Sequence, residues 1–534
     1  MVQAHPAERP LDTFPALNDR GHARRMIVVF GDQLDPKAEP LREMDRERDI
    51  VLMMEVAEES THVPSHLQRT VLFLSAMRHF AVDLSEKSVR VRYVRLDDAH
   101  NTHSFESEIE RAARIHRPES IHCTHPGEWR VLRMIERVSA SLGTTLEIHE
   151  DTHFFTPLST FEAWASGRKS MVMEYFYREQ RRRLGVLMQS DGKTPVGDRW
   201  NLDEDNRESF KRAPDVPSPY TPRRDAITDG VIELVSARFP DNPGSLDDFR
   251  WPVTRAQARR ALDDFIEHRL GAFGPYEDAM WSGEPFLYHS ALSAAGNLKL
   301  LDPRECVRKA IDAYESGRAP LNSVEGFVRQ WIGWREFIRG IYWTQGEDYP
   351  NRNGLEHDGA LPGLYWSGDT DMACMRDCIG GVLEHGYAHH IPRLMVMGNF
   401  AMLAGVHARE VADWYLGMFV DAVDWASNPN TIGMSQHADH GVIATKPYAA
   451  SGKYISRMSN YCKGCRYDPR ERTGESACPF NTLYWDFLIR HSDRFRSNRR
   501  MGMMIKNAER LSRDERVRIT REGEAIRARL GVTG

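Results

Sequence analysis

The feature that most constrains the fold is a series of short apolar runs that alternate with helical patterns in the first third of the chain. Residues 64–82, for example, carry apolar side chains at helical spacing between two of these runs. Strands separated by helices at this rhythm predict a doubly wound α/β domain with a parallel sheet over residues 26–155. The five expected strands are residues 26–30, 49–54, 89–94, 120–123 and 146–149.

Polar residues follow the first two expected strands. Asp32 and Gln33 come directly after the first strand, and Glu55 follows the second. Ligands of doubly wound sheets bind beyond the carboxyl ends of the strands, so these three side chains mark a candidate pocket. The loop lacks a G-x-G-x-x-G pattern, so nothing specific indicates a dinucleotide there.

The rest of the chain changes character. With 534 residues the chain is too long for one hydrophobic core, so a second domain is expected. Residues 226–500 carry long amphipathic helical patterns and few strand signals, which predicts an all-α domain. The remaining segments are interpreted as a flexible N-terminal arm at 1–25, an interdomain linker at 156–225 and a basic C-terminal extension at 501–534.

Composition narrows the class of protein. Hydrophobic residues make up 41% and charged residues 28%, which is typical of globular proteins. A net charge of -6 argues against a histone-like coating of nucleic acid but leaves room for a local basic groove. No run approaches the roughly 20 apolar residues of a membrane span, and the N-terminus lacks the apolar core of a signal peptide. Seven cysteines do not form a disulfide scaffold in so long a chain, and we expect a cytoplasmic protein.

The most specific local motif is Cys462-x2-Cys465-x12-Cys478 followed by proline. Two thiolates three residues apart can bind one centre, and a third from a short loop can complete it; zinc and an iron–sulfur cluster both fit this spacing. Cys374 or Cys378 could supply a fourth thiolate. Because no cysteine follows Cys478, and because a Cys-Pro pair suits iron–sulfur ligation, we favour the cluster.

Aromatic residues and histidines gather between residues 325 and 430. Trp331 and Trp334 lie at i, i+3, on one face of an expected helix. Such a cluster is either part of a large core or a relay of oxidisable rings around a redox cofactor. The pair His389-His390 is either structural or a source of a general acid, since imidazole titrates near neutral pH.

Several longer motifs occur in a fixed order. They are Val28-Val-Phe-Gly-Asp-Gln-Leu34, Met173-Glu-Tyr-Phe-Tyr-Arg178, Asn322-Ser-Val-Glu-Gly-Phe327, Gly333-Trp-Arg-Glu-Phe337, His389-His390, Lys446-Pro-Tyr448 and Cys478-Pro-Phe-Asn-Thr-Leu-Tyr-Trp-Asp-Phe487. In these motifs, and over nearly its whole length, the chain resembles the prokaryotic (6-4) photolyases, the iron–sulfur branch of the cryptochrome/photolyase family. The resemblance implies the cryptochrome/photolyase fold, with an α/β antenna domain followed by an all-α FAD-binding domain.

The resemblance also implies an activity. It is the light-driven repair of (6-4) pyrimidine–pyrimidone photoproducts in DNA, a lyase reaction, by electron transfer from excited, reduced FAD. The family's catalytic histidine, which donates a proton, falls on His390, with His389 beside it. The family's electron-transfer aromatics fall on Trp366, Trp414 and Tyr415.

The resemblance assigns cofactors to particular residues. FAD is expected at Tyr288, His289, Ser290, Ala291, Leu292 and Ser293, with Gln330, Trp334 and Asp421 as neighbours of the flavin. A [4Fe–4S] cluster is expected on Cys374, Cys462, Cys465 and Cys478. A 6,7-dimethyl-8-ribityllumazine antenna is expected at Asp32, Gln33 and Glu55, and a Mg²⁺ ion at Asp203 and Asp278.

UV-damaged DNA is the expected partner of a monomeric protein. Phosphate contacts are expected from Arg178, Arg181, Arg182 and Arg183; the alternative is a solvent-facing charged helix.

The chain departs from the family's pattern in two places. Ser427 stands where an acidic residue is expected near the flavin, and residues 436–441 (Gln-His-Ala-Asp-His-Gly) depart from an Asp-Gly-Gly form. The first departure lends weight to a second hypothesis, a cryptochrome-type blue-light photoreceptor. A third hypothesis is an iron–sulfur nucleic-acid-binding module without flavin.

Overall fold

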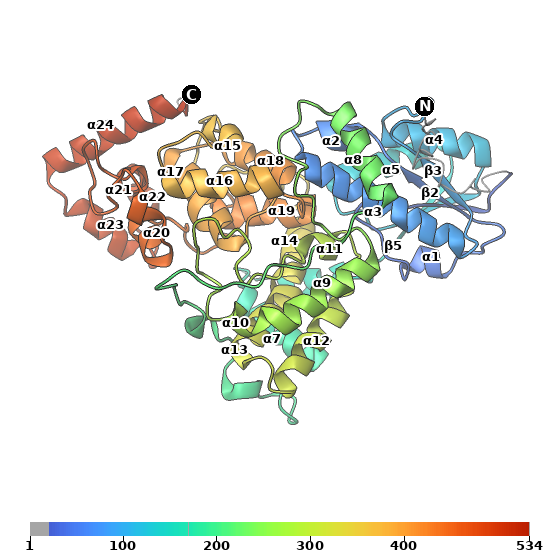
Figure 1. Cartoon of the computed structure of the whole chain (residues 1–534), viewed down its shortest axis with the longest axis horizontal. Coiled ribbons are helices and arrows are strands. Elements are labelled where there is room, and N and C mark those ends of the chain that lie inside the picture. The colour runs from blue at the N-terminus through green and yellow to red at the C-terminus, as the bar shows by residue number, and fades with distance from the viewer. Residues whose placement is uncertain (1–20, 169, 533–534) are drawn as a thin grey trace, which may run out of the picture. The chain divides into compact units, whose positions relative to one another are not determined.

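The computed structural model describes residues 21–168 and 170–532, which form two compact units (Figure 1). The first unit contains the chain up to residue 157 together with residues 220–262 and 292–303, and the second contains the rest. Most of the predicted N-terminal arm lies outside the described residues, as do the last two residues of the predicted C-terminal extension.

The first unit is built on a five-stranded parallel sheet, as the strand rhythm predicts. Its strands follow the order β3-β2-β1-β4-β5, and the direction in which the strands are added reverses between β1 and β4. In such sheets the point of reversal is the usual place for a ligand. The strands are β1 (Arg25–Val28), β2 (Ile50–Met54), β3 (Val91–Val94), β4 (Ser120–Thr124) and β5 (Thr145–His149).

Helices cover this sheet and bury its apolar residues. All five residues of β2 are buried, as expected for an inner strand of a parallel sheet, whereas β5 at the edge leaves Thr145 and Glu147 exposed. The helices of this unit are α1 (Glu39–Arg42), α2 (Glu58–Thr61), α3 (Leu67–Glu86), α4 (Phe105–His116), α5 (Trp129–Leu142), α8 (Ala226–Arg238) and α11 (Ser293–Asn297).

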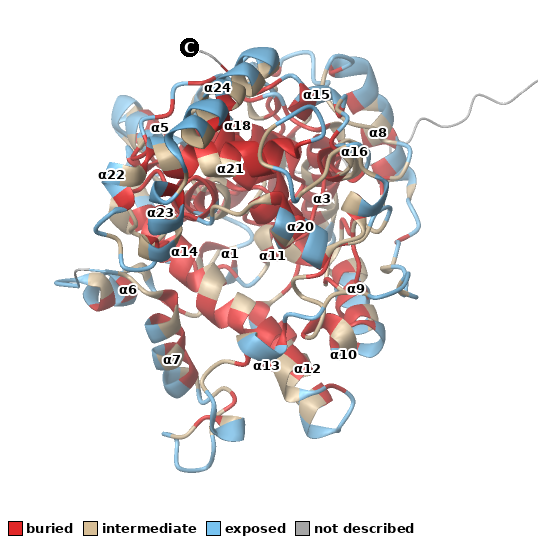
Figure 2. Cartoon of the chain, turned by 90° about the vertical axis from the view of Figure 1, so that its left-hand side faces the viewer, coloured by how far each residue is buried: buried red, intermediate tan, exposed pale blue. Residues whose placement is uncertain are grey.

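The second unit is helical, which confirms the predicted fold class. Figure 2 shows α21 mostly buried, because apolar residues such as Phe480, Leu483 and Phe487 face the core of this unit. Its helices are α6 (Leu158–Ala165), α7 (Met173–Leu184), α10 (Leu270–Phe273), α13 (Leu321–Arg329), α14 (Arg335–Gln345), α15 (Leu364–Ser367), α16 (Ala373–His385), α17 (Asn399–Ala404), α18 (Ala408–Met418), α19 (Asp424–Asn428), α20 (Gly452–Met458), α21 (Pro479–Arg490), α22 (Ser492–Phe495), α23 (Gly502–Glu509) and α24 (Arg513–Leu530). The division between the units falls inside α9 (Arg255–His268) and at the start of α12 (Pro303–Glu315).

The structure revises two of the predicted segment boundaries. Most of the predicted linker, residues 158–219, belongs to the second unit and contains α6 and α7. The described part of the predicted C-terminal extension forms α23 and α24, and α24 packs against α21. Arg527 of α24 pairs with the fully buried Asp486 of α21, so this basic helix is held by a specific ion pair. Among the described helices, none has the length and apolarity to cross a bilayer.

Candidate functional site

The four cysteines expected to hold a cluster line one small cavity in the second unit. Cys374 comes from the first turn of α16, and Cys462 and Cys465 come from a 3-10 turn and the residue after it. Cys478 is the N-cap of α21, where the following proline suits the first helical position. The other residues that line the cavity are Met372, Gly452, Ile455, Tyr461 and Tyr467.

The two candidates for the fourth thiolate differ in their surroundings. Cys378, one helical turn after Cys374, does not line the cavity; its Sγ donates to the Tyr461 hydroxyl at 3.8 Å. Burial, and then the neighbouring sulfurs, raise the pKa of Cys374 far above its usual value. Four sulfurs in so apolar a place become thiolates together only around a cationic centre, so the donor set fits a four-thiolate cluster.

Two buried imidazoles face each other in the second unit. The rings of His289 and His389 stack with centroids 4.0 Å apart and planes 17° apart. Within the described part of the chain, His289 Nε2 and His389 Nδ1 have no hydrogen-bond partner. Burial lowers the pKa of His289 to about 3 and that of His389 well below its usual value, so both rings are neutral. Partnerless buried polar atoms are rare in proteins and mark a place where a polar ligand would complete the site.

His390 differs from its neighbour because its side chain is exposed. Desolvation of the ring by the surrounding protein, and then the positive charge of Arg393, lower the pKa of His390. The residue nevertheless keeps contact with solvent. Arg393 is fixed by Asp421, whose two oxygens accept from the guanidinium at 2.9 and 3.0 Å. Asp421, expected beside the flavin, therefore also positions the cation that lowers the pKa of the expected proton donor.

The remaining residues expected at the flavin have varied partners. The Tyr288 hydroxyl donates to the Asp215 carbonyl at 3.1 Å, and Gln330 Nε2 donates to Glu277 Oε1 at 3.3 Å. Trp334 is half-buried. The loop has backbone strain at Ala291, whose φ of 54° is unusual for a residue with a side chain and is typical of functional loops. Ser290 and Ala291 belong to the second unit, and Leu292 and Ser293 to the first.

The expected electron-transfer aromatics lie in the second unit as a buried pair and a surface ring. Trp414 is buried, and its ring lies 5.5 Å from that of Tyr415. Trp366 is exposed, with 39% of its surface accessible. Tyr365, which the sequence analysis did not single out, packs edge-on against Trp414 at 5.3 Å. Its place next to Trp366 in the sequence is the signal that could have identified it.

The two residues expected to bind Mg²⁺ belong to an acidic group. Asp203 pairs with Arg207 at 2.6 Å and with Arg329 at 3.3 Å. Burial, and then Asp203, raise the pKa of Asp278 to about 6. Burial also raises the pKa of Glu277, a third carboxylate that the sequence analysis missed, to about 7. The oxygen donors suit Mg²⁺, but two guanidinium groups already neutralise part of their charge.

The expected antenna residues divide into two sets. Gln33 Nε2 donates to the carbonyl oxygens of Thr124 and His125 at 3.0 and 3.4 Å, which places Gln33 where the strand order reverses. Asp32 is half-buried, and burial raises its pKa to about 6, although Lys299 acts in the opposite direction.

Glu55 does not fit the role expected for it. Oε1 accepts from Arg78 Nε at 2.6 Å and from the Tyr93 hydroxyl at 2.7 Å. Oε2 accepts from Arg78 at 2.8 Å and from the Leu96 N–H at 2.8 Å. A carboxylate has about four acceptor positions, so none remains for a ligand. Glu55 is therefore a structural residue that ties β2 to α3 and β3, because an arginine distant in the sequence packs against it.

The four expected phosphate-binding arginines also divide. Arg181 is fully buried and donates to the carbonyl oxygens of Val186, Leu187 and Trp200, so it is a structural residue and the expected DNA contact is wrong. Arg178 is half-buried and pairs with Glu174. Arg182 and Arg183 are exposed.

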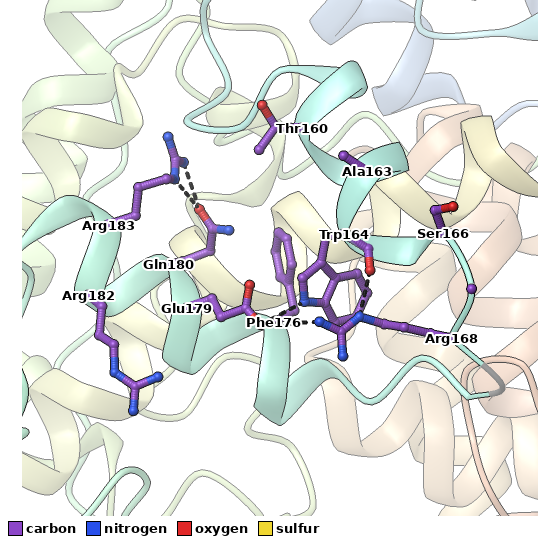
Figure 3. Close-up of a pocket in the computed structure, with 11 residues that line it drawn as sticks. Thr160, Ala163, Trp164, Ser166, Arg168, Phe176, Glu179, Gln180, Arg182 and Arg183 are labelled. Atoms are coloured by element: carbon purple, nitrogen blue, oxygen red, sulfur yellow. Dashed lines mark hydrogen bonds and ion pairs between the residues drawn. The ribbon is translucent and has the colours of Figure 1, made fainter.

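A pocket of about 720 Å³ lies between α6 and α7 (Figure 3). Arg182 and Arg183 line it together with Trp164 and Arg168. Figure 3 shows Arg182 and Arg183 extending in different directions from α7. None of the residues expected at the flavin or the cluster lines this pocket, so it is a separate basic and aromatic surface.

Comparison with known proteins identifies the family. A family model described as deoxyribodipyrimidine photo-lyase-related protein matches residues 27–251. A (6-4) photolyase of Agrobacterium fabrum strain C58 is 47% identical over 494 residues, which cover 92% of this chain and 97% of that protein.

Two solved structures share the fold. A bacterial class III photolyase from Agrobacterium tumefaciens superimposes with a TM-score of 0.53 at 14% identity, over 82% of this chain and 86% of that one. The cryptochrome of Synechocystis sp. PCC6803 gives 0.53 at 13% identity, over 82% and 89%. The fold is thus that of photolyases and cryptochromes, and the extent of identity shows that the chain belongs to the (6-4) photolyase family.

Proposed function

We propose that this protein repairs (6-4) pyrimidine–pyrimidone photoproducts in DNA under blue light, with bound FAD as electron donor and His390 as proton donor. The observation that carries this proposal is the 47% identity to a (6-4) photolyase over 92% of the chain. The exposed His390 supports it from the structure, since it follows a buried imidazole that stacks on a second one and each of these two rings has one nitrogen without a partner.

The flavin site would lie at the stacked imidazoles of His289 and His389. FAD, when bound in its reduced form, supplies the electron for the reaction under light. The protein would bind it through the free His289 Nε2 and His389 Nδ1, through the loop that begins at Tyr288, and through Gln330 and Trp334. The same two rings stay neutral, so they add no positive charge at this place.

His390 would hold and deliver a proton from Nδ1 or Nε2 to the lesion. Its exposure allows contact with a nucleotide turned out of the duplex, a step that costs less at a damaged, poorly stacked site. Arg393 disfavours the protonated ring, so in the free enzyme the proton is weakly held. A nearby lesion phosphate would offset Arg393 and favour protonation when the substrate is present.

Trp366, Trp414 and Tyr415 would carry electrons from the protein surface inward. Tyr365 would belong to the same set, since it contacts the Trp414 ring and neighbours the exposed Trp366 in sequence. The order from exposed to buried rings is what supports this role.

The remaining cofactors would bind at other groups of residues. Cys374, Cys462, Cys465 and Cys478 would hold a [4Fe–4S] cluster, supported by the single cavity that they line. Asp203, Glu277 and Asp278 would hold Mg²⁺ if a bound DNA phosphate drew Arg207 and Arg329 away from Asp203.

A ribityllumazine antenna would bind at Asp32 and Gln33, at the reversal point of the sheet. Because Glu55 has no acceptor position left, Glu58 is the better carboxylate at this end of the sheet. It begins α2, shortly after β2, and its Oε1 accepts from the Phe105 N–H at 2.7 Å, which leaves Oε2 for a ligand.

DNA would be bound by the exposed arginines of α7. The guanidinium carbon of Arg182 lies over the Trp200 ring, 4.4 Å from its centroid, a contact that restrains the guanidinium without neutralising it. Arg183 and Arg178 would add phosphate contacts, and Arg181 is excluded from this role.

The test is repair of a duplex that carries one (6-4) lesion, under blue light and in the dark, for wild type and His390→Ala. His268→Ala, which changes an exposed histidine of α9, is the matched control. We expect repair in wild type and in the control and its loss in His390→Ala. Repair at the wild-type rate by His390→Ala would refute the assigned proton donor.

A second candidate function is a blue-light photoreceptor, favoured by Ser427 at a position where the family's pattern has an acid. Light-dependent reduction of bound flavin without any lesion repair would support it over the enzyme. A protein purified without flavin would refute both.

A further inference from the structure

The first unit contains a group of metal-ligating side chains that no part of the proposed repair uses. His122 lies on β4, and Glu147 and His149 lie on β5. The two strands pair in parallel, with His122 opposite Glu147. Because side chains alternate between the faces of a strand, His149 lies two residues from Glu147 on the same face. The sheet therefore brings all three side chains together.

The distances between their donor atoms approach those of a bound zinc ion. His122 Nδ1 lies 2.9 Å from His149 Nε2. The Glu147 carboxylate comes within 3.7 Å of each of these nitrogens. Zinc–ligand bonds of about 2.0–2.1 Å at tetrahedral angles put neighbouring donor atoms about 3.3 Å apart. If the donor atoms moved by a few tenths of an ångström, their spacing would match that of a zinc-bound set.

Each imidazole has a polar group near its second nitrogen, within hydrogen-bond distance at His122 and farther away at His149. His122 Nε2 lies 2.8 Å from the Ser120 hydroxyl, and His149 Nδ1 lies 3.7 Å from Glu39 Oε2 at the start of α1. Metal-bound histidines usually direct their second nitrogen at a carboxylate or another hydrogen-bond partner in this way.

The burial of the group also suits a metal. The side chains of His122 and His149 are 2% and 7% exposed, whereas Glu147 is 60% exposed. The nitrogens are thus shielded from water, while the exposed carboxylate gives an ion, and a water molecule as fourth ligand, access from solvent.

We propose that His122, Glu147 and His149 form a Zn²⁺ site that ties the edge strand β5 to β4. The ligands are His122 Nδ1, His149 Nε2 and a Glu147 oxygen, with water in the fourth position and Glu39 orienting His149. Without metal, His122 carries its proton on Nδ1 and donates it in a hydrogen bond to His149 Nε2. On binding, His122 moves its proton from Nδ1 to Nε2, and the Ser120 hydroxyl turns from donor to acceptor, so no net proton is released.

The test is Zn²⁺ binding by the full-length protein with its cofactors in place, measured in competition with a chromophoric chelator. The variants are His149→Asn and Glu147→Gln, and the matched control is Glu119→Gln, an exposed carboxylate next to β4. We expect the wild type and the control to bind one more Zn²⁺ than His149→Asn. Glu147→Gln should bind at least about tenfold more weakly, a loss usual even for an outer partner of a metal ligand. Its exposed side chain makes this variant informative even if His149→Asn fails to fold.

Substitution with Co²⁺ separates this site from the cysteines. Imidazole and carboxylate ligands give visible ligand-field bands, whereas thiolates add a charge-transfer band in the near ultraviolet. We expect the wild type to show visible bands that disappear in His149→Asn, with any thiolate band unchanged. Equal Zn²⁺ affinity and stoichiometry in all four proteins would overturn the proposal, as would a Co²⁺ spectrum that His149→Asn leaves unaltered. A failure of repair has no bearing on either measurement.

Discussion

Glu55→Gln is expected to destabilise the α/β unit strongly. The Glu55 and Arg78 side chains are 0% and 4% exposed and share two short hydrogen bonds. Glutamine keeps the shape but removes the charge, so it leaves a buried guanidinium without its counter-ion. It also places an amide NH₂ group against hydrogen-bond donors, such as the Leu96 N–H, that contact a carboxylate oxygen in the wild type.

The magnitude follows from the cost of breaking a buried ion pair on one side, about 3–5 kcal/mol. Amide exchange that requires opening of this sheet should then accelerate by about 10²- to 10⁴-fold, since every 1.4 kcal/mol is about tenfold. Hydrogen exchange followed by mass spectrometry measures this in peptides that cover β2 and β3. Peptides from the helical unit should change far less.

Glu110→Gln is the matched control. It makes the same substitution in the same unit but breaks only a surface pair, with Arg114 69% exposed. Such pairs contribute about 0.3–0.5 kcal/mol, so exchange should rise about twofold. If Glu55→Gln behaved like this control, the carboxylate would be solvated, and our reason for removing Glu55 from the antenna site would be wrong.

Three further predictions concern the helical unit. Arg393→Met removes a positive charge that lowers the pKa of His390, and this pKa should therefore rise. The alkaline limb of the pH profile of repair should then move to higher pH, and an unshifted limb would contradict this reasoning. Burial, and then Arg490, lower the pKa of His357 to about 2, so the unfolded chain takes up a proton near pH 6.5 that the folded chain does not. Its contribution to stability is complete above pH 6.5 and falls as the pH drops, by about 1.4 kcal/mol per pH unit; His357→Asn should flatten this slope in denaturant titrations at pH 7.5 and 5.5. Gly452→Ala places a Cβ 3.0 Å from the Cys478 sulfur, so it should lower the iron content at unchanged flavin if the cavity holds the proposed cluster. Gly464→Ala meets nothing within 4 Å and should leave the iron content unchanged; equal iron in both variants would refute the assignment of the cavity.

The sequence predicted the elements of the α/β unit well because local periodicity reflects backbone geometry. A buried parallel strand needs apolar residues on both faces, and the run at residues 49–54 reports this without any knowledge of its neighbours. The sequence placed the boundaries of the two units less accurately. Residues 158–219 contain prolines and charges, yet α6 and α7 pack into the helical unit, and no local pattern records which unit a helix joins.

At the candidate site, too, the sequence predicted which nearby residues lie together better than which distant residue joins them. The spacing of Cys462, Cys465 and Cys478 predicted that these three side chains lie close together, because only short loops separate them. The spacing left the fourth cysteine open between Cys374 and Cys378, which lie one helical turn apart, and only the family resemblance pointed to Cys374. In the structure Cys374 lines the cavity with the other three, whereas Cys378 donates to Tyr461.

The sequence by itself determined the parallel α/β unit, the helical second part, the family and the set of residues that can carry the chemistry. Tertiary structure alone decided which of them are available: it buried Arg181 among carbonyl oxygens, filled every acceptor of Glu55, and brought His122 and His149 within 2.9 Å across two strands. The physical reason is that a pattern along the chain reports backbone geometry and solvent exposure, which are local. Hydrogen-bond partners and electrostatic neighbours come from residues far apart in sequence, and only packing brings them together.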